Sequence, residues 1–527
     1  MGGMTYTNEE PEWRAEPVTV GIGPLSFEDV LAVARHDARV ELSPEAEAEI
    51  SRSREVVEAL ADDVEPHYGV STGFGALATR HIPVDSRAQL QRSLIRSHAA
   101  GAGPAVEREV VRALMLLRLS TLATGRTGVR LETARAYAAV LSSGITPLVH
   151  EYGSLGCSGD LAPLAHCALV VMGEGTVLDA SGSMVDAGFA LEQQGIEPVQ
   201  LREKEGLALI NGTDGMLGML VLAIDDLRSL LKLADVAAAM SVEGLLGTDD
   251  VFAADLHELR PHLGQALSAA NIRAVMADSP IRESHRTDDC TRVQDAYSLR
   301  CAPQVHGGAR DTIEHAAGVA AAELASAIDN PVVTKDGRVE SNGNFHGAPV
   351  AYVLDFLAIV AADVASMSER RTDRFLDKAR NQGLPAFLAH DPGVDSGLMI
   401  AQYTQAAMVS EMKRLAAPAS VDSIPSSAMQ EDHVSMGWSA ARKLRTSVDA
   451  LGRVLAIELV TAARGLRLRS PLEPGPASQA VIRALEDLVG ETTGPDRVVA
   501  DTLGAAHLGV LDRSYLAAAE SVTGPLR

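Results

Sequence analysis

Aromatic residues are scarce in this 527-residue sequence and make up only 3% of it, although hydrophobic residues make up 46%. β-Rich architectures draw heavily on aromatic and β-branched side chains, whereas Ala and Leu, which are prominent here, favour closely packed helices. The composition therefore predicts a mainly α-helical protein. The chain is long enough for a large core and, by length alone, for about three domains.

Cysteine is also scarce, with four residues and no CxxC pair. So few cysteines in a long chain do not form a disulfide framework, and reduced thiols in a cytoplasm are the expectation. The first residues contain no basic region and no apolar segment, which predicts that no secretory signal is present. Apolar stretches are short or, as in Val350–Ala365, interrupted by aspartates, so no membrane span is expected.

Signatures of metal, nucleotide and nucleic-acid binding are missing as well. Fifteen histidines occur, but without an HExxH motif or another ligand spacing, which predicts no metal site. The glycine-rich segments lack the GxxxxGK[ST] pattern, so no bound nucleotide is expected. A formal net charge of −24 argues against nucleic acid or an anionic membrane as the main partner. A small zwitterionic substrate remains compatible, because local charge decides its binding.

The helical pattern changes near residue 210. We expect a mobile arm over residues 1–20, then short helices alternating with glycine-rich loops over 21–210. Residues 211–465 are predicted to form a bundle of long helices, and 466–527 a C-terminal helical segment. The long helices are expected at Met216–Leu246, Ala309–Ile328, Val350–Arg371, Tyr403–Ala416 and Val434–Arg464, and weak strands at Thr176–Leu178, Pro331–Thr334 and Gly337–Val339.

The most informative motif is the triplet Cys157-Ser158-Gly159. Glycine at 159 leaves its amide nitrogen uncrowded and its backbone free to bend. In a tight bend that nitrogen can attack the carbonyl carbon of Cys157 and close a five-membered ring. Loss of water, followed by dehydration of the Ser158 side chain, would leave a methylene conjugated to the ring, which is a strong electrophile. For an arbitrary tripeptide, a glycine-rich turn before a helix is the simpler interpretation.

Two local predictions concern the ends of helices. Asp160 is expected to cap a helix over Leu161–Met172, whose N-terminal amides would stabilise negative charge on a ring carbonyl. Pro104 is expected in the first turn of another helix, where its missing N–H would not be needed.

The run GSLGCSGDLAPLAHCAL (153–169) resembles the cofactor loop of the histidine and aromatic amino-acid ammonia-lyases. That family builds a methylidene-imidazolone (MIO) group from an Ala-Ser-Gly triplet. Here cysteine replaces alanine, and only its main chain would enter the ring. Six further blocks resemble the family in order: YGVSTGFG (68–75), SHAAGAG (97–103), LINGTDG (209–215), VQDAYSLRCAPQVHG (293–307), GNFHGAPVA (343–351) and SIPSSAMQEDHVSMG (423–437).

The resemblance implies an enzyme that eliminates ammonia from an α-amino acid without oxidation. It also implies a mostly helical fold with an N-terminal MIO domain, and a homotetramer whose active sites are assembled from several subunits. The MIO group would form from Cys157, Ser158 and Gly159, with no metal or nucleotide.

Matching positions then imply the residues that perform the chemistry. Tyr68 matches the family base, and Tyr297 would stabilise the reacting centre with Gln294 nearby. Arg300 would pair with the substrate carboxylate, for which a guanidinium is suited by its bidentate geometry. Tyr297 and Arg300 lie three apart and could share a helical face. Asn211 would contact the cofactor and the carboxylate; taken alone, it would be a helix cap.

Four further matches bear on the substrate pocket. His98 matches a histidine of histidine and tyrosine lyases, and a polar ring can hydrogen-bond an imidazole or a phenol. Glu431 lies in a Gln-Glu-Asp-His block that resembles histidine lyases, where the carboxylate holds the imidazole or acts as an alternative base. Phe345 matches a family aromatic residue near the cofactor and Met399 a pocket residue, and both are expected to contact the substrate; taken alone, each would be interpreted as a core residue. After Phe345 the block departs from the family, because Gly347-Ala348-Pro349 stands where Ala-Glu-Pro is usual.

Three functions remain open from the sequence. The favoured one is conversion of L-histidine to trans-urocanate and ammonia, the first step of histidine degradation. The alternative is a lyase or aminomutase that acts on tyrosine or phenylalanine through the same MIO group. Glu431 argues against this alternative. A non-catalytic scaffold would have no use for this set of side chains. The sequence leaves open whether the electrophile engages the amine or the ring, and whether Tyr68 or Glu431 takes the proton.

Overall fold

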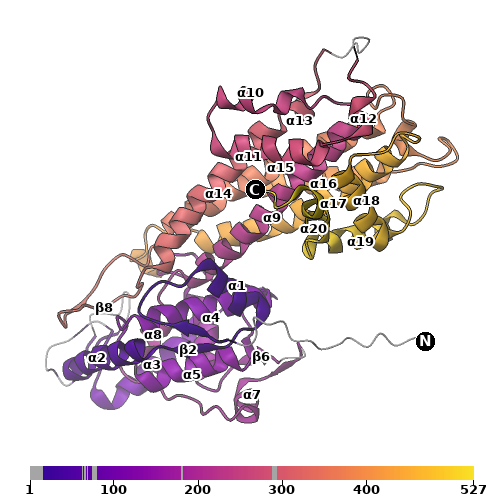
Figure 1. Ribbon diagram of the computed structural model, residues 1–527. Helices are drawn as coiled ribbons and strands as arrows, with labels where there is room; N and C mark the ends of the chain where they lie inside the picture. Colours follow the sequence, from indigo (N-terminus) through magenta and orange to yellow (C-terminus); the bar gives the residue numbers. More distant parts are fainter. Residues whose placement is uncertain are drawn as a thin grey trace. The chain divides into compact units, whose positions relative to one another are not determined.

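The computed structural model describes residues 16–61, 63, 67, 69–73, 80–179, 182–287 and 293–527. These residues are mainly α-helical and the strands among them are short, which confirms the predicted fold class (Figure 1). Two compact units divide the chain. Unit 1 comprises Met1–Leu222, Gly318–Leu354 and Pro418–Arg442, and unit 2 comprises Ala223–Ala317, Asp355–Ala417 and Lys443–Arg527. The four-segment division expected from the sequence stays a prediction.

Unit 1 is built around a buried helix, α4 (Arg108–Ala123). Its residues from Val110 onward are all buried, since aliphatic side chains occupy every face of the helix. The buried guanidinium of Arg112 donates to the carbonyls of Val33 (2.8 Å) and Leu141 (3.0 Å). The other short helices of the unit are α1 (Phe27–His36), α2 (Pro44–Ala61), α3 (Val84–His98), α5 (Leu131–Ser142), α6 (Leu161–Val171), α7 (Ala187–Gln193), α8 (Glu205–Ile210) and the 3₁₀ turn η5 (Ser427–Met429).

Short strands form small sheets in unit 1. The pairs are β1 (Val18–Val20) with β2 (Val40–Leu42), parallel; β3 (Ala102–Ala105) with β5 (His150–Tyr152), antiparallel; β4 (Thr146–Pro147) with β6 (Thr176–Leu178) and β6 with β7 (Met184–Asp186), antiparallel; and β8 (Val332–Val333) with β9 (Val339–Glu340), antiparallel. The strands expected near 176, 331 and 337 are thus confirmed.

Pro104 corrects one expectation. It lies in β3, and α4 begins only at Arg108, so the prediction that Pro104 opens this helix is wrong. Pairing of β3 with β5 keeps the backbone extended at that point. A proline is tolerated in a strand at a position where the partner strand does not need a hydrogen bond from its N–H.

Four long helices contribute residues to both units: α9 (Asp214–Gly244), α14 (Ala302–Leu324), α15 (Ala348–Leu376) and α17 (Gly437–Arg467). Together with α16 (Met399–Leu415) they confirm the five long helices expected from the sequence, with ends that differ by a few residues. Within unit 2, the buried carboxylate of Glu458 accepts hydrogen bonds from Arg371 (2.5 and 2.9 Å) and from Ser241 (2.7 Å), and so joins α9, α15 and α17.

Unit 2 also contains shorter helices around these long ones: η3 (Asp250–Phe252), α10 (Ala254–Glu258), α11 (Leu263–Met276), α12 (Pro280–Glu283), α13 (Tyr297–Arg300), η4 (Ala386–Leu388), α18 (Pro476–Val489), α19 (Val499–Leu511) and α20 (Ser514–Thr523). Among the described residues, α15 is the one helix long and apolar enough to cross a membrane, and 61% of its apolar window is buried inside the protein. A core helix has the same properties.

Candidate active site

The triplet Cys157-Ser158-Gly159 lies in a bent loop directly before α6, as the sequence predicts. Gly159 has φ +78°, in the left-handed region that glycine adopts without strain. A Cβ atom at this position would lie 2.0 Å from the carbonyl oxygen of Gly212. That carbonyl accepts the Asp160 N–H at 2.7 Å, which pairs the loop with the turn that follows α8. Only glycine fits at 159.

Two polar groups at this loop have no hydrogen-bond partner among the described residues, and both fit the prosthetic group that the family resemblance implies. Among the described residues, the buried Gly159 N–H has no hydrogen-bond acceptor, so its nitrogen is not engaged elsewhere. Unpaired buried N–H groups are rare and costly in native proteins. The buried Oδ1 of Asn211, on the neighbouring turn, also has no partner in the described part of the chain. The residues present therefore suit ring formation at 157–159.

The Asn211 turn is itself held by a buried arginine of α4. Arg118 Nη1 donates to the carbonyls of Ala208 and Asn211, both at 2.9 Å, and Arg118 Nη2 donates to Asp214 Oδ2 at 2.7 Å. Because the Arg118–Asp214 pair is buried and both terminal nitrogens of the guanidinium donate hydrogen bonds, the turn has little freedom. This arginine gives no family signal in the sequence, and only the fold reveals its role.

Two more of the six sequence blocks contact the triplet loop. The Met436 N–H donates to the Leu155 carbonyl at 2.8 Å, and the Ser435 hydroxyl donates to the Gly156 carbonyl at 2.9 Å. The Gly347 N–H lies 3.5 Å from that same carbonyl. Segments near residues 211, 347 and 435 thus meet at one loop, although the chain separates them widely. Ser435 is a contact residue that the sequence analysis did not single out, although it lies inside a matched block.

Asp160 corrects a second expectation. It occupies the position before α6, but its side chain makes no capping bond to that helix. Its buried carboxylate instead accepts the N–H groups of Gly215 and Met216, each at 2.9 Å, and the Ser154 hydroxyl at 2.8 Å. The first turn of α9 supplies free donors and the positive end of a long helix dipole, so the carboxylate caps α9. Burial raises the pKa of Asp160 to about 7 even so.

Glu431 faces the triplet. The Ser158 hydroxyl donates to Oε1 of Glu431 at 3.3 Å, and the Ser426 hydroxyl donates to Oε2 at 3.1 Å. Burial, together with the nearby Glu431 carboxylate, raises the pKa of Cys157 to about 12. The Cys157 thiol is therefore protonated near neutral pH, which removes the thiolate that a cysteine nucleophile would need.

His98 lies at the end of α3 and is also close to Glu431. Burial lowers the pKa of His98, while the Leu94 carbonyl and the Glu431 charge act in the opposite direction. Nδ1 lies 2.9 Å from the Leu94 carbonyl, which can only accept, so Nδ1 carries the proton of the neutral ring. Nε2 then presents a lone pair and has no partner among the described residues. Glu431 and His98 are thus two acceptors near one triplet.

Of the remaining predicted residues, Phe345 and Met399 lie in the described part of the chain. Phe345 is half-buried in unit 1, two residues before the Gly347 contact. Met399 is half-buried in unit 2, at the first position of α16. Tyr68 lies outside the described residues.

Gln294, Tyr297 and Arg300 form a cluster in unit 2. Arg300 Cζ lies 4.7 Å from the ring centroid of Tyr297, which confirms that the two share a face of α13. Arg300 Nη2 donates to Gln294 Oε1 at 2.9 Å. Arg300 Nε is buried without a partner among the described residues, and Tyr297 is 70% exposed. The guanidinium of Arg300, with its unpaired Nε donor, thus lies beside the phenol ring of Tyr297.

No group of three or more His, Cys, Asp and Glu side chains that could hold a metal ion occurs in the described ranges.

Residues 25–487 match the aromatic amino acid lyase family. The chain belongs to this family. Membership confirms the resemblance seen in the seven sequence blocks.

Within the aromatic amino acid lyases, the chain is similar to a histidine ammonia-lyase of Streptomyces avermitilis, with 66% identity over 509 residues that cover 97% of this chain and 99% of that protein. Its fold is similar to that of a tyrosine aminomutase from Streptomyces globisporus, with a TM-score of 0.90, 37% identity and coverage of 97% and 100%. It is also similar to a histidine ammonia-lyase from Trypanosoma cruzi, with a TM-score of 0.88, 38% identity and coverage of 96% of both chains.

Proposed function

We propose that this protein is a carbon–nitrogen lyase that converts L-histidine to trans-urocanate and ammonia, the first step of histidine degradation. The observation that carries the proposal is the position of Glu431, 3.3 Å from the Ser158 hydroxyl and close enough to His98 to affect its pKa. The 66% identity to a histidine ammonia-lyase over nearly the full chain supports the same substrate.

The prosthetic group of the family is formed by the chain itself. The free Gly159 nitrogen attacks the Cys157 carbonyl carbon, one water is lost, and the Ser158 side chain loses a second water. The resulting MIO group supplies an electrophile that activates the amino acid for loss of ammonia. Cys157, Ser158 and Gly159 hold it through the backbone, and no metal or nucleotide takes part.

The two acceptors beside the triplet select the side chain of the substrate. His98 Nε2 and the Glu431 carboxylate can both accept hydrogen bonds, and neither can donate one in the state described above. A substrate imidazole donates one N–H bond when neutral and two when protonated, a phenol donates one O–H bond and a phenyl ring donates none. His98 and Glu431 are half-buried, and acceptors that a bound substrate covers without pairing cost binding energy, so this pair favours histidine over tyrosine and tyrosine over phenylalanine.

The polar head of the substrate needs a cation and a base. Arg300, with its unused Nε donor and its Nη2 fixed by Gln294, is proposed to bind the carboxylate, together with Asn211. Tyr297 would stabilise the reacting centre, and Tyr68 or Glu431 would take the β-proton. Phe345 and Met399 would shape the pocket.

These residues are proposed to meet in a cytoplasmic homotetramer whose active sites combine several subunits. Neither nucleic acid nor a membrane is expected as a partner. Dilution below the concentration at which the tetramer dissociates should then abolish activity, which sedimentation and kinetics can measure on the same sample.

A lyase or aminomutase acting on tyrosine is the second candidate, since the tyrosine aminomutase shares the fold and a single acceptor suits a phenol. A side-by-side assay of L-histidine, L-tyrosine and L-phenylalanine separates the two. We expect kcat/KM for histidine to exceed that for the others by at least about 100-fold. Preferred turnover of tyrosine, or a β-amino acid product, would overturn the proposal.

A further inference from the structure

The segment before α16 has an unusual backbone. Phe387 and Leu388 have φ values of +56° and +53°, a left-handed region that residues with a Cβ seldom adopt. Gly397 has φ +58°, and a Cβ there would lie 2.4 Å from the Phe387 carbonyl oxygen. The Leu398 N–H donates to that carbonyl at 3.0 Å. Strained backbone of this kind persists only where surrounding contacts hold it, and it clusters at functional sites.

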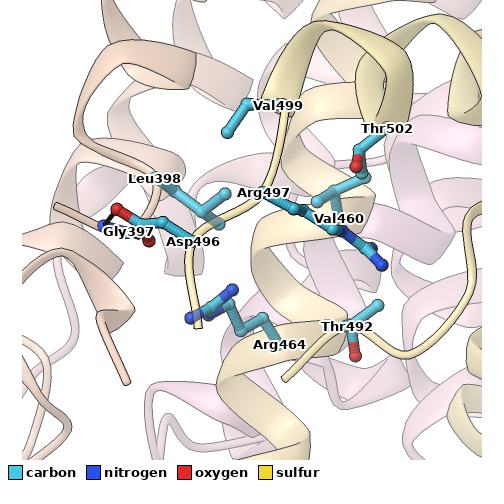
Figure 2. Close-up of a pocket in the computed structure, with 9 residues that line it drawn as sticks. All are labelled: Gly397, Leu398, Val460, Arg464, Thr492, Asp496, Arg497, Val499 and Thr502. Carbon is cyan, nitrogen blue, oxygen red and sulfur yellow. Dashed lines mark hydrogen bonds between the residues drawn. The ribbon is translucent and has the colours of Figure 1, made fainter. Parts of the chain in front are cut away.

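One set of contacts comes from the loop between α18 and α19. The Asp496 carboxylate accepts the N–H of Ser396 at 2.7 Å and the N–H of Gly397 at 3.0 Å. In return, the Asp496 N–H donates to Asp395 Oδ1 at 2.8 Å. Figure 2 shows Asp496 beside Gly397 and Leu398 in the pocket that these residues line. Hydrogen bonds in both directions therefore join residues 395–397 to this loop.

A second contact comes from Arg464, on α17. Its Nε donates to the Leu388 carbonyl at 2.6 Å, and its Nη2 donates to the Gly494 carbonyl at 3.0 Å. The side chain lines the same pocket and is largely buried (Figure 2). One guanidinium thus joins the strained turn to the loop that carries Asp496.

These contacts determine where α16 begins. The first residue of the helix is Met399, and the preceding Leu398 provides no side-chain cap. The N-terminal amides of a helix are partly positive and need acceptors or negative charge. Asp496 supplies that charge from a distant part of the chain, directly at the residues that precede Met399. Asp496 thus holds the backbone that leads into Met399, through the amides of Ser396 and Gly397.

We propose that Asp496 is a positioning residue for the substrate pocket, and that the loop 490–498 influences amino acid binding through Met399. The inference rests on the proposed function, in which Met399 shapes the pocket. It assigns to part of the C-terminal helical segment a role that the family motifs do not cover, since none of the matched blocks extends beyond residue 437.

The first test compares Asp496→Ala with a matched control, Asp487→Ala, in the full-length enzyme. Asp487 is an exposed carboxylate at the end of α18 and has no hydrogen bond or ion pair among the described residues. Asp496→Ala should raise KM for L-histidine about 5- to 10-fold and change kcat less than about 2-fold. The reason is that Met399 would no longer be held in place to contact the bound substrate. Asp496→Asn keeps one acceptor oxygen and should recover part of the loss. Asp487→Ala should behave as wild type.

A double-mutant cycle tests the route through Met399. In a Met399→Ala background, Asp496→Ala should raise KM less than about 2-fold, because the side chain that it positions is gone. The same rise in both backgrounds, or an unchanged KM in Asp496→Ala, would overturn the proposal. If Asp496→Ala fails to fold, the same double-mutant cycle is measured with Asp496→Asn.

A measurement without substrate separates this proposal from the proposed function. Amide hydrogen exchange over residues 396–402 should be faster in Asp496→Ala than in Asp487→Ala. Unchanged exchange would refute the positioning role whatever the substrate is. If the enzyme prefers tyrosine, the proposed function fails, but the cycle can be measured with tyrosine and still decides the role of Asp496.

Discussion

The Ser158 hydroxyl donates a hydrogen bond to Glu431 across 3.3 Å, although 273 positions separate the two residues in the chain. In the proposed function, the Ser158 side chain is dehydrated to form the electrophile, and Glu431 accepts a hydrogen bond from the imidazole of the substrate. Their contact would then place the prosthetic group and substrate recognition at one point.

Ser158→Ala should remove the electrophile without unfolding the protein. Activity should fall by at least about 10³-fold, because no methylene can form from alanine. The intact mass of the wild-type chain should be two water molecules below the sequence mass. Cys157→Ala is the matched control and should keep both the mass loss and the activity, since only the main chain of residue 157 enters the ring. A wild-type chain of full sequence mass would refute ring formation.

Glu431→Gln should lower kcat/KM for L-histidine by about 10²- to 10³-fold, since it removes the charged acceptor and the alternative base. Asp432→Asn changes the neighbouring carboxylate, which is exposed and has no hydrogen bond in the described structure, and should have little effect. Steady-state kinetics of both variants decides the matter. Equal effects of the two substitutions would mean that Glu431 acts only through net charge.

The pH dependence of histidine binding should report the state of His98. Burial lowers the pKa of His98, so the acceptor at Nε2 should survive below the usual histidine pKa of about 6.5 and be lost on further acidification. His98→Gln cannot titrate. The ratio of wild-type to His98→Gln kcat/KM should therefore be flat above about pH 6.5 and fall below it. A ratio that is constant at all pH values would contradict the assignment.

Gly159→Ala should destabilise the fold by more than about 3 kcal/mol, because its Cβ would collide with the Gly212 carbonyl oxygen. Gly182→Ala provides the control. It has nearly the same φ, +79°, but nothing lies within 4 Å of a Cβ there, so about 1 kcal/mol of strain is expected. Denaturant unfolding of both variants measures the difference. Similar losses would show that backbone strain, and not the contact with Gly212, makes glycine necessary.

Asp160 should make the stability of the fold depend on pH. Burial raises its pKa to about 7 in the folded protein, above the unfolded value of about 4. Its contribution to stability is therefore complete below about pH 4 and is lost as the pH rises through about 7. Asp160→Asn mimics the neutral form. The melting temperature of the wild type, relative to that of Asp160→Asn, should fall between about pH 4 and about pH 7 and stay level above that. A constant difference would contradict the raised pKa.

Much of the secondary structure could be predicted because it depends on local pattern. The long helices α9 and α15 follow from apolar residues repeated at helical spacing over many turns, and β6 from a short β-branched run. Pro104 and Asp160 were predicted wrongly for one shared reason. Each prediction follows a sound local rule, but a distant segment supplies a different partner. The backbone around Pro104 pairs with the strand at 150–152, and the Asp160 carboxylate accepts hydrogen bonds from the first turn of α9.

By itself, the sequence determined the family, the mainly helical fold and the triplet that can close on itself, because those depend on residue identity and short-range order. Only the tertiary structure decided which residues meet. In the folded protein Glu431 contacts Ser158, and Asp160 caps α9. Arg118 and Asp496 hold turns by hydrogen bonds, and no sequence motif identifies either residue. Contacts of this kind form because buried charges and buried backbone groups need hydrogen-bond partners. Which groups are buried together cannot be predicted from the spacing of residues along the chain.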